Sequence, residues 1–226
     1  ENLRSRQYNI YLNSGYTDDM MDFETGPVVG AKNAVRQLKM LEQIVISHLR
    51  SDERLWPLSM APGPTYQHDL EYLQTAFTKK WDQGTHDYLG KKYGIVQEIL
   101  GDVHVNFSLD GELINEIYHR FYADRYPNRI DFQNHLYFKL AQKFYLYQWL
   151  FMDNGTYYSM KEFFGPVRLR RHNHDMHDID GALHKGIDYL EFRNFDLDPL
   201  SRTGISDDTI NFLELMLLNS ILSPLP

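Results

Sequence analysis

The segment Tyr189-Leu190-Glu191-Phe192-Arg193-Asn194-Phe195-Asp196-Leu197-Asp198-Pro199 indicates how this chain folds. Leu190 and Phe192 alternate with Glu191 and Arg193, and successive side chains of a strand point to opposite faces of a sheet. The alternation therefore predicts a half-buried strand with its apolar side on a core. Its open side carries a carboxylate and a guanidinium, which suggests a chemical role beyond solvation.

Two other segments show the same period of two, which favours two more strands. One alternates Val103, Val105, Phe107 and Leu109 with His104, Asn106 and Ser108, and the other alternates Val167 and Leu169 with Arg168 and Arg170. If the polar faces of these strands share one surface, an imidazole, an amide and several guanidiniums converge around Glu191. The pattern predicts an antiparallel sheet with one apolar and one functional face.

Helical periodicity separates these strands. Apolar residues recur at helical spacing from Ala34 to Leu49, which predicts an amphipathic helix over about 32–49. Further helices are expected at 85–93, ended by Gly94, at 113–121 and at 132–151, and a last one is expected after Ser206. The proline-rich stretch 55–65 predicts an irregular connection whose Trp56, Leu58 and Met60 are buried. We therefore expect one α+β domain over residues 1–226, with helices on the apolar side of the sheet.

Composition narrows the classes of protein. The 226 residues include 23 Lys and Arg against 31 Asp and Glu, with a net charge of -8 and no basic block, which argues against nucleic-acid binding. The chain has no cysteine, so it is neither a disulfide scaffold nor a Cys-ligated zinc module. The apolar tract 210–222 is too short and too polar for a membrane span, and no signal peptide opens the chain. A soluble, cytoplasmic protein is the expectation.

An acidic segment at 16–24 adds Asp18, Asp22 and Glu24, which share one side if the segment is extended. Clustered carboxylates repel unless cations neutralise them, and Mg2+ takes oxygen ligands, commonly including phosphate. Guanidiniums bind phosphate or carboxylate through paired hydrogen bonds. The combination indicates a metal-nucleotide or phosphoryl-transfer site. The alternative is that Glu191 and Arg193 form only a structural ion pair at the surface.

Two other signals carry little weight. His172, His174, His177 and His184 form a His-rich stretch, but without a carboxylate framework such a stretch is more typical of solvated surface than of a zinc site. The glycines at 84, 90 and 94 match neither common phosphate-binding loop. Any nucleotide must therefore bind through a less common fold.

Five stretches carry a resemblance to a known family. They are Glu1-Asn2-Leu3-Arg4, Leu55-Trp56-Pro57-Leu58-Ser59-Met60, Lys92-Tyr93-Gly94 with 103–108, Pro166-Val167-Arg168-Leu169-Arg170, and 189–199 with Gly204-Ile205. Together they resemble the glutamate-cysteine ligases, especially the first domain of bifunctional glutathione-synthesising proteins in Gram-positive bacteria. The resemblance implies a glutamine synthetase-like, carboxylate-amine ligase fold whose sheet has a concave polar active-site face.

The resemblance also implies an activity. Enzymes of this family use Mg-ATP to phosphorylate the side-chain carboxylate of glutamate, and the amine of cysteine then attacks the acyl phosphate. Glutamate, cysteine and ATP are the implied substrates, two or three Mg2+ ions the implied cofactors, and a fused or separate glutathione synthetase domain the implied partner. The implied metal ligands are Glu1, Asp18, Glu24, His104 and Glu191, with His104, Glu191 and Arg193 as catalytic residues; Arg168, Arg170, Arg193 and Asn106 would bind ATP phosphates or glutamate.

The chain departs from the family in several places, two of which bear on the site. After Trp149, residues 153–158 lead almost at once to Phe163 and Pro166, so dozens of family residues are missing there. The first glutamate of the family's Glu-x-Glu pair would lie before Glu1, and we therefore expect a piece of a longer protein, with a shortened relative as the alternative. Because the losses concern the second substrate, a ligase for another amine and a non-catalytic nucleotide-binding relative stay open as alternatives.

Overall fold

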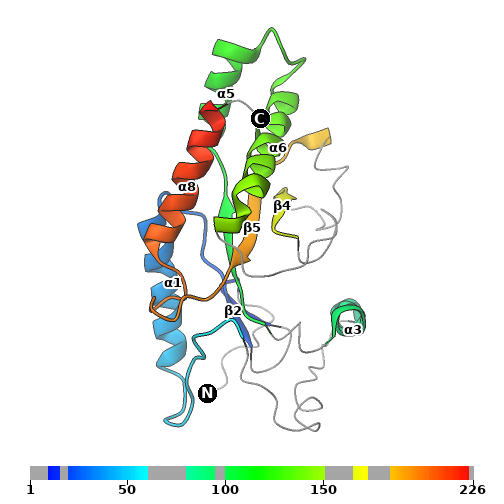
Figure 1. Ribbon diagram of the computed structural model, residues 1–226. Helices are drawn as coiled ribbons and strands as arrows, with labels where there is room; N and C mark the ends of the chain where they lie inside the picture. Colours follow the sequence, from blue (N-terminus) through cyan, green and yellow to red (C-terminus); the bar gives the residue numbers. More distant parts are fainter. Residues whose placement is uncertain are drawn as a thin grey trace. The chain divides into compact units, whose positions relative to one another are not determined.

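The computed structural model describes residues 10–15, 20–60, 80–94, 100–150, 165–172 and 184–223 (Figure 1). The chain divides into two compact units, one of Glu1–Gly101 with Leu197–Asp208 and one of Asp102–Asp196 with Thr209–Pro226. Both contain helices together with a small antiparallel sheet. The expected mixture of helices and antiparallel strands is therefore confirmed. Within the described ranges, no helix combines the length and the apolar character needed to cross a membrane.

The first unit contains a two-stranded sheet and two helices. β1 (Leu12–Ser14) pairs antiparallel with β2 (Met21–Phe23), which places Asn13 opposite Asp22. α1 (Ala31–Ile46) confirms the amphipathic helix, with Val45 on its buried side. It ends three residues earlier than expected because the Ser47 hydroxyl donates to the Ile44 carbonyl, so this side chain competes with the backbone for the acceptor.

α3 (Lys80–Tyr93) is the second helix of this unit. It ends at Gly94, as expected, and the Gly94 N–H donates to the Gly90 carbonyl at 3.0 Å. Gly94 has a φ of 89°, which is the left-handed conformation that glycine adopts without strain.

The expectation that Trp56, Leu58 and Met60 are buried is wrong. Trp56 is 53% and Met60 73% exposed, and Leu58 is also exposed. The indole N–H of Trp56 instead donates to the Met60 carbonyl at 2.7 Å and closes a local turn. The segment is held by a polar residue: Ser59 accepts from the Gly101 N–H through its carbonyl and from the Leu197 N–H through its hydroxyl.

The second unit is built on a three-stranded antiparallel sheet that confirms the predicted strands. The sheet is ordered β3 (Val103–Phe107), β5 (Tyr189–Phe195), β4 (Val167–Arg170), so β5 is central (Figure 1). Glu191 on β5 lies directly opposite Asn106 on one neighbour and Arg168 on the other. Three predicted site residues therefore form one row across the sheet.

The pairing of β3 with β5 contains an irregularity beside this row. Val103 pairs with Phe195 and Val105 with Phe192, so β5 fits one more residue than β3 into the interval. The extra residue shifts the alternation by one position, and Phe195 is buried at 5% exposure although it shares the odd numbering of Glu191 and Arg193. The bulge thus returns the end of β5 to the core.

The apolar face of the sheet packs on α6 (Arg129–Tyr147), which continues into the short 3-10 turn η3 (Gln148–Leu150). The rings of Phe144 and Phe192 lie 4.6 Å apart, and both side chains are fully buried. The hydroxyl of Tyr137 accepts from the Leu109 N–H at 3.1 Å and donates to the Asp188 carbonyl at 2.8 Å. It therefore ties the end of β3 to the start of β5.

The remaining helices complete this unit. α5 (Gly111–Ile117) begins at the capping residue Asp110, whose carboxylate accepts from two backbone N–H groups, and it runs on into a π-helical turn, η2 (Tyr118–Tyr122). α8 (Asp207–Leu222) begins directly after Ser206 with two acidic residues in its first turn, as expected. The Lys139 ammonium on α6 donates to the Ile221 carbonyl at 2.8 Å and so fastens the end of α8.

Candidate active site

Glu191 is the centre of a charged cluster on the polar face of the second unit. Its side chain is only 10% exposed. Arg170 Nε donates to Glu191 Oε2, and the other carboxylate oxygen, Oε1, lies 3.4 Å from both Arg193 Nε and His104 Nδ1. Three strands thus contribute to one cluster, because β5 supplies Glu191 and Arg193, β4 supplies Arg170, and β3 supplies His104.

The buried carboxylate of Glu191 is compensated by the positive charges around it. Burial by itself would raise the pKa of Glu191. The hydrogen bond from Arg170 and the positive charges of Arg170, Arg193 and His104 outweigh burial, so the pKa lies below its ordinary value. Glu191 is therefore a stable anion at neutral pH, which makes it a structural and electrostatic centre and not a proton donor.

The two arginines of the cluster are held in place by this anion. The side chains of Arg170 and Arg193 are 11% and 8% exposed. A guanidinium presents five N–H donors, and each arginine faces Glu191 through Nε. The geometry suits the binding of a phosphate or carboxylate by donors that are fixed before the ligand arrives.

His104 extends the cluster toward a residue that the sequence did not single out. His104 Nε2 lies 2.8 Å from Asp102 Oδ2 and 3.1 Å from Arg193 Nε. Asp102 immediately precedes β3 and shares the face of His104 because residues two apart in an extended chain point to the same side. Extending the period-two pattern by one more position would have found it.

The structure brings together four of the predicted site residues: His104, Arg170, Glu191 and Arg193 make direct contacts. Asn106 and Arg168 join their face through strand register. Glu24 belongs to the other unit, where it is exposed and its carboxylate accepts from Asn13 Nδ2 at 2.7 Å. Glu1 and Asp18 lie outside the described residues.

The described residues supply part of the donor set for the implied Mg2+ ions. His104 Nδ1 and Glu191 Oε1 face each other, and both are metal-ligand atom types. Over the described ranges, however, no three His, Asp or Glu side chains gather closely enough to hold a metal ion. The described part of the cluster balances its carboxylate with guanidiniums and does not form a metal shell by itself.

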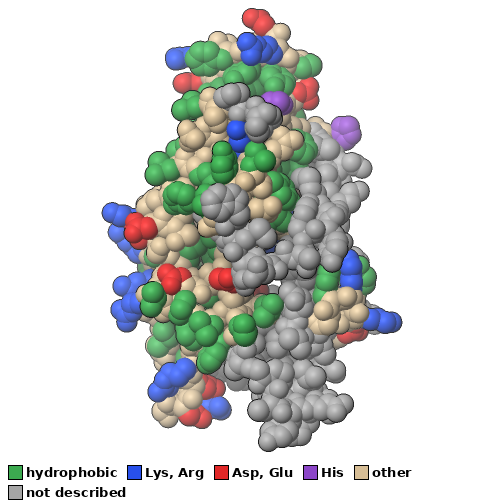
Figure 2. Space-filling model, in the orientation of Figure 1, with side chains coloured by type: hydrophobic (Ala, Val, Ile, Leu, Met, Phe, Trp, Pro, Cys, Tyr) green, Lys and Arg blue, Asp and Glu red, His purple; other side chains and the backbone are tan. Residues whose placement is uncertain are grey.

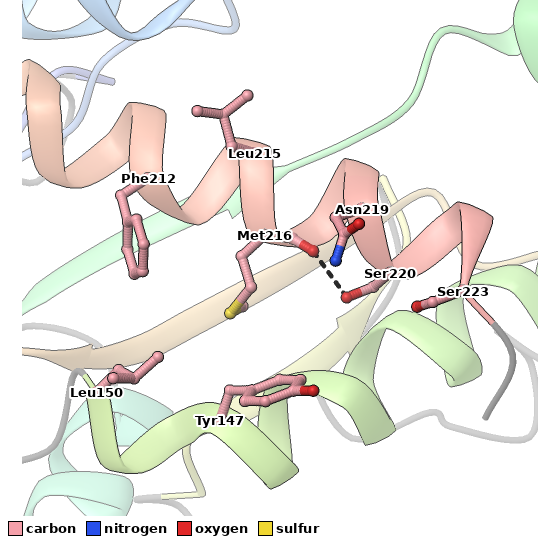
Figure 3. Close-up of a pocket in the computed structure, with 8 residues that line it drawn as sticks. All are labelled: Tyr147, Leu150, Phe212, Leu215, Met216, Asn219, Ser220 and Ser223. Atoms are coloured by element: carbon pink, nitrogen blue, oxygen red, sulfur yellow. Dashed lines mark hydrogen bonds between the residues drawn. The ribbon is translucent and has the colours of Figure 1, made fainter. Parts of the chain in front are cut away.

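A cavity of about 440 Å³ lies elsewhere in the second unit (Figure 3). Side chains of α6, η3 and α8 line it, including Tyr147, Leu150, Phe212 and Met216. Figure 3 shows these mostly apolar side chains directed into the space between the helices. None of the predicted site residues lines this cavity, so the charged cluster and the cavity are separate features.

A mixed fold whose central strand carries a buried carboxylate between guanidiniums and an imidazole defines the chain as an α+β protein with a charged sheet face. Comparison with known proteins then identifies the family. The model of the glutamate-cysteine ligase family matches residues 1–154 and 152–226. The chain therefore belongs to the glutamate-cysteine ligase family.

Similar proteins agree with this assignment. The glutathione biosynthesis bifunctional protein of Streptococcus agalactiae is 30% identical over 272 aligned positions, which include 96% of this chain and 35% of that protein. The protein of the same name from Streptococcus mutans is 28% identical, with 96% and 35% covered. This chain thus spans about a third of the length of these curated relatives.

Solved structures match the fold as well. A bifunctional glutathione synthetase from Pasteurella multocida superposes with a TM-score of 0.84 at 25% identity, over 97% of this chain and 35% of that one. The glutamate-cysteine ligase of Francisella tularensis, solved in complex with AMP, superposes with a TM-score of 0.79 over 98% of this chain and 61% of that one. At 15% identity the second match supports the fold alone.

The alignments also bear on the residues expected to be missing after Trp149. The alignment with the S. agalactiae protein has 272 positions, more than the 226 residues of this whole chain, so that relative carries dozens of residues that this chain lacks within the matched region. The family model matches in two segments that meet at residues 152–154. Both findings agree with a chain that is shorter than its relatives near residues 152–154.

Proposed function

We propose that this chain catalyses the ATP-dependent joining of the side-chain carboxylate of L-glutamate to the amine of L-cysteine, the first step of glutathione biosynthesis. The observation that carries the proposal is the family match along both segments of the chain, which includes the strands that build the cluster at Glu191. The match covers residues of both compact units, which supports one ligase domain over 1–226.

The proposed chemistry has two steps. A γ-carboxylate oxygen of glutamate attacks the terminal phosphorus of ATP, and ADP leaves. The amine nitrogen of cysteine then attacks the acyl carbon, phosphate leaves, and the nitrogen loses one proton as the amide forms. No side-chain nucleophile is needed in either step. Most of the rate enhancement would come from holding two anionic substrates close together in a fixed geometry.

The residues of the cluster suit this task. Arg170 and Arg193 would donate to phosphate or carboxylate oxygens, and Glu191 keeps both side chains oriented in the absence of substrate. Arg168 and Asn106 flank Glu191 in the same row and would add donors to the substrate. His104 stands beside Glu191 on the neighbouring strand, where it would help to set the local charge.

Mg2+ ions, two or three in number, would screen the repulsion between ATP and the reacting carboxylate when bound. His104 and Glu191 are the ligands that the described cluster offers, and we propose Glu1, Asp18 and Glu24 as the others. A concave polar face of a glutamine synthetase-like sheet would hold the substrates. We further propose a cytoplasmic location and a glutathione synthetase domain, fused or separate, that consumes the product; the names of the bifunctional relatives support this partner.

The decisive experiment is an ADP-release assay on the intact protein with Mg-ATP and glutamate, adding cysteine or another amine one at a time. ADP release that requires cysteine supports the proposal. Release with a different amine would assign another carboxylate-amine ligase, which is the second candidate because the chain is shortened near 152–154. Nucleotide binding without turnover for any amine would indicate a non-catalytic relative and overturn the proposal.

A further inference from the structure

The buried hydroxyl of Tyr137 on α6 links β3 to β5 close to the row that contains Glu191. The side chain of Tyr137 is only 1% exposed. Its hydroxyl accepts from the Leu109 N–H at 3.1 Å and donates to the Asp188 carbonyl at 2.8 Å. A backbone N–H can only donate and a carbonyl can only accept, so the direction of both hydrogen bonds is fixed. One oxygen atom therefore satisfies a backbone group beside each of the two strands.

The strand register shows where this link lies in the sheet. Asn106 on β3 lies opposite Glu191 on β5, and the same register continued by three residues would place Leu109 opposite Asp188. β3 ends two residues before Leu109, and β5 begins directly after Asp188. The Tyr137 hydroxyl thus stands between two residues that an uninterrupted ladder would set face to face. Its oxygen therefore helps to decide how far apart these two strand ends lie.

Other buried contacts hold the start of β5 without reaching β3. Gln133 Nε2 on α6 donates to the Ile187 carbonyl at 2.5 Å, and Asn134 Oδ1 accepts from the Ile187 N–H at 2.9 Å. The Asp188 N–H donates to a carbonyl of β4 at 2.9 Å. Of these contacts to the start of β5, only the one through Tyr137 continues to the end of β3. Gln133 and Tyr137 lie one helical turn apart on α6, which makes them a matched pair for comparison.

The hydroxyl keeps the proton that this link requires. Burial raises the pKa of Tyr137, and this effect outweighs the hydrogen bond from the Leu109 N–H, which lowers it. A tyrosinate could only accept and would leave the Asp188 carbonyl without its donor. The neutral hydroxyl retains both bonds.

We propose that Tyr137 is a positioning residue for the proposed ligase reaction: its hydroxyl sets the spacing between β3 and β5, and thereby the place of Asn106 relative to Glu191. β3 is an edge strand of the three-stranded sheet and pairs with β5 alone in it, so a displaced strand end moves the side chains of β3. A displacement of about 1 Å among groups that position substrates can lower the rate by about 100-fold. The catalytic part of this role rests on the proposed function.

The first test measures the sheet itself, in the full chain without substrates. Tyr137→Phe removes the oxygen and keeps the ring, and ¹H–¹⁵N NMR of the labelled protein reports the backbone amides. We expect the amide signals of Leu109, Asn106 and Glu191 to shift in this variant. Gln133→Met is the matched control, because it removes a buried hydrogen bond from the same helix to the same segment without touching β3. Its Asn106 signal should stay in place.

The ADP-release assay gives the second readout, at a temperature well below the unfolding midpoint of each variant. Tyr137→Phe is expected to lower kcat by about 10- to 100-fold with little change in the KM for ATP. Gln133→Met should keep wild-type kcat, and so should Tyr118→Phe, whose hydroxyl donates to the Tyr126 carbonyl at 3.3 Å elsewhere in the unit. A merely structural role of Tyr137 would lower the unfolding temperature and leave the kcat of the folded variant unchanged.

An unmoved Asn106 signal in Tyr137→Phe would overturn the proposal, and so would an equal loss of kcat in Gln133→Met. A moved signal with unchanged kcat would overturn the catalytic part. If Tyr137→Phe fails to fold, hydrogen exchange at the Leu109 amide of the wild type decides: protection like that inside β3 is expected, and exchange as fast as in an open loop contradicts the link. Wild-type protein without ligase turnover would overturn the proposed function, and the NMR comparison would still decide whether Tyr137 sets the strands.

Discussion

The charged face of the β3–β5–β4 sheet and the cavity between α6 and α8 belong to the same unit but are built on opposite principles. The cavity has a volume of about 440 Å³, and the side chains that line it are mostly apolar. The sheet face instead gathers the buried carboxylate of Glu191, two guanidiniums and an imidazole within hydrogen-bonding or ion-pair distance. Figure 2 shows hydrophobic side chains at the surface among polar ones. On α8, four large apolar side chains are exposed: Phe212, Leu215, Leu218 and Leu222.

Compensated charge, and not empty space, distinguishes the proposed active site of this protein. Apolar surface in a groove can result from imperfect helix packing at no large cost. A buried carboxylate surrounded by guanidiniums is expensive to desolvate and has no packing advantage over apolar side chains of similar size.

The largest effect is expected for Glu191→Gln. The change keeps the size of the side chain but removes the charge that holds Arg170 and Arg193, so turnover should fall by about 10²- to 10³-fold or more. The ADP-release assay measures the loss, and circular dichroism checks that the fold is intact. A fully active variant would show that the charged face is not the reactive site.

A smaller loss is expected for Arg170→Lys. Lysine keeps the positive charge but not the planar fork, so the bond to Glu191 weakens and kcat/KM should fall by about 10- to 100-fold. Arg120→Lys, at an exposed position on η2, is the matched control and should be indistinguishable from the wild type. Equal kinetics for the two variants would mean that only the charge of Arg170 matters.

On the helical side, Leu217→Ala should change stability without changing chemistry. Leu217 is fully buried on α8, and its truncation should lower the free energy of unfolding by about 2–5 kcal/mol. Leu215 is 66% exposed on the same helix, so Leu215→Ala should stay within about 0.5 kcal/mol of the wild type. Urea unfolding measures both. A large loss of kcat in either folded variant would show that the helical side of the unit contributes to turnover.

The smallest effect concerns Glu42, a residue of α1 whose carboxyl pKa is shifted upward, whereas that of Glu191 is shifted downward. Burial raises its pKa from 4.5 to about 7. Between these values the unfolded chain has released this proton while the folded chain retains it, so the free energy of unfolding should fall as pH rises through the window. Glu42→Gln should remove that slope and gain stability relative to the wild type at pH 8. Urea unfolding at pH 4, 6 and 8 measures it, and a slope equal to that of the wild type would contradict the assignment.

Much of the second unit could be predicted from the sequence because its signals are local. Alternation in 103–109, 167–170 and 189–193 predicted the strands and their polar face, although β3 ends at Phe107. Ser206 as a helix-capping residue predicted the start of α8. The error at Trp56 and Met60 arose because composition cannot tell whether an apolar side chain finds a partner. In that segment Ser59 makes the long-range hydrogen bonds, and a single serine gives no such signal in a sequence.

The candidate site was predicted in its residue types and only partly in its contacts. His104, Arg170, Glu191 and Arg193 meet as expected, whereas the partnership of Glu191 with guanidiniums could not be distinguished from metal binding by sequence. Glu24 shows the limit most clearly, because its distance to Glu191 depends on how the two units are placed. The roles of Glu1 and Asp18 stay predictions.

By itself, the sequence determined which side chains share a face, because a strand alternates with a fixed period of two that needs no tertiary information. It also determined the family, through motifs that remain recognisable at 25–30% identity. Only the tertiary structure decided that Asn106, Glu191 and Arg168 form one row, and that a bulge in β5 returns Phe195 to the core. Strand order and register follow from the packing of the whole sheet on α6, and no short stretch of sequence contains that information.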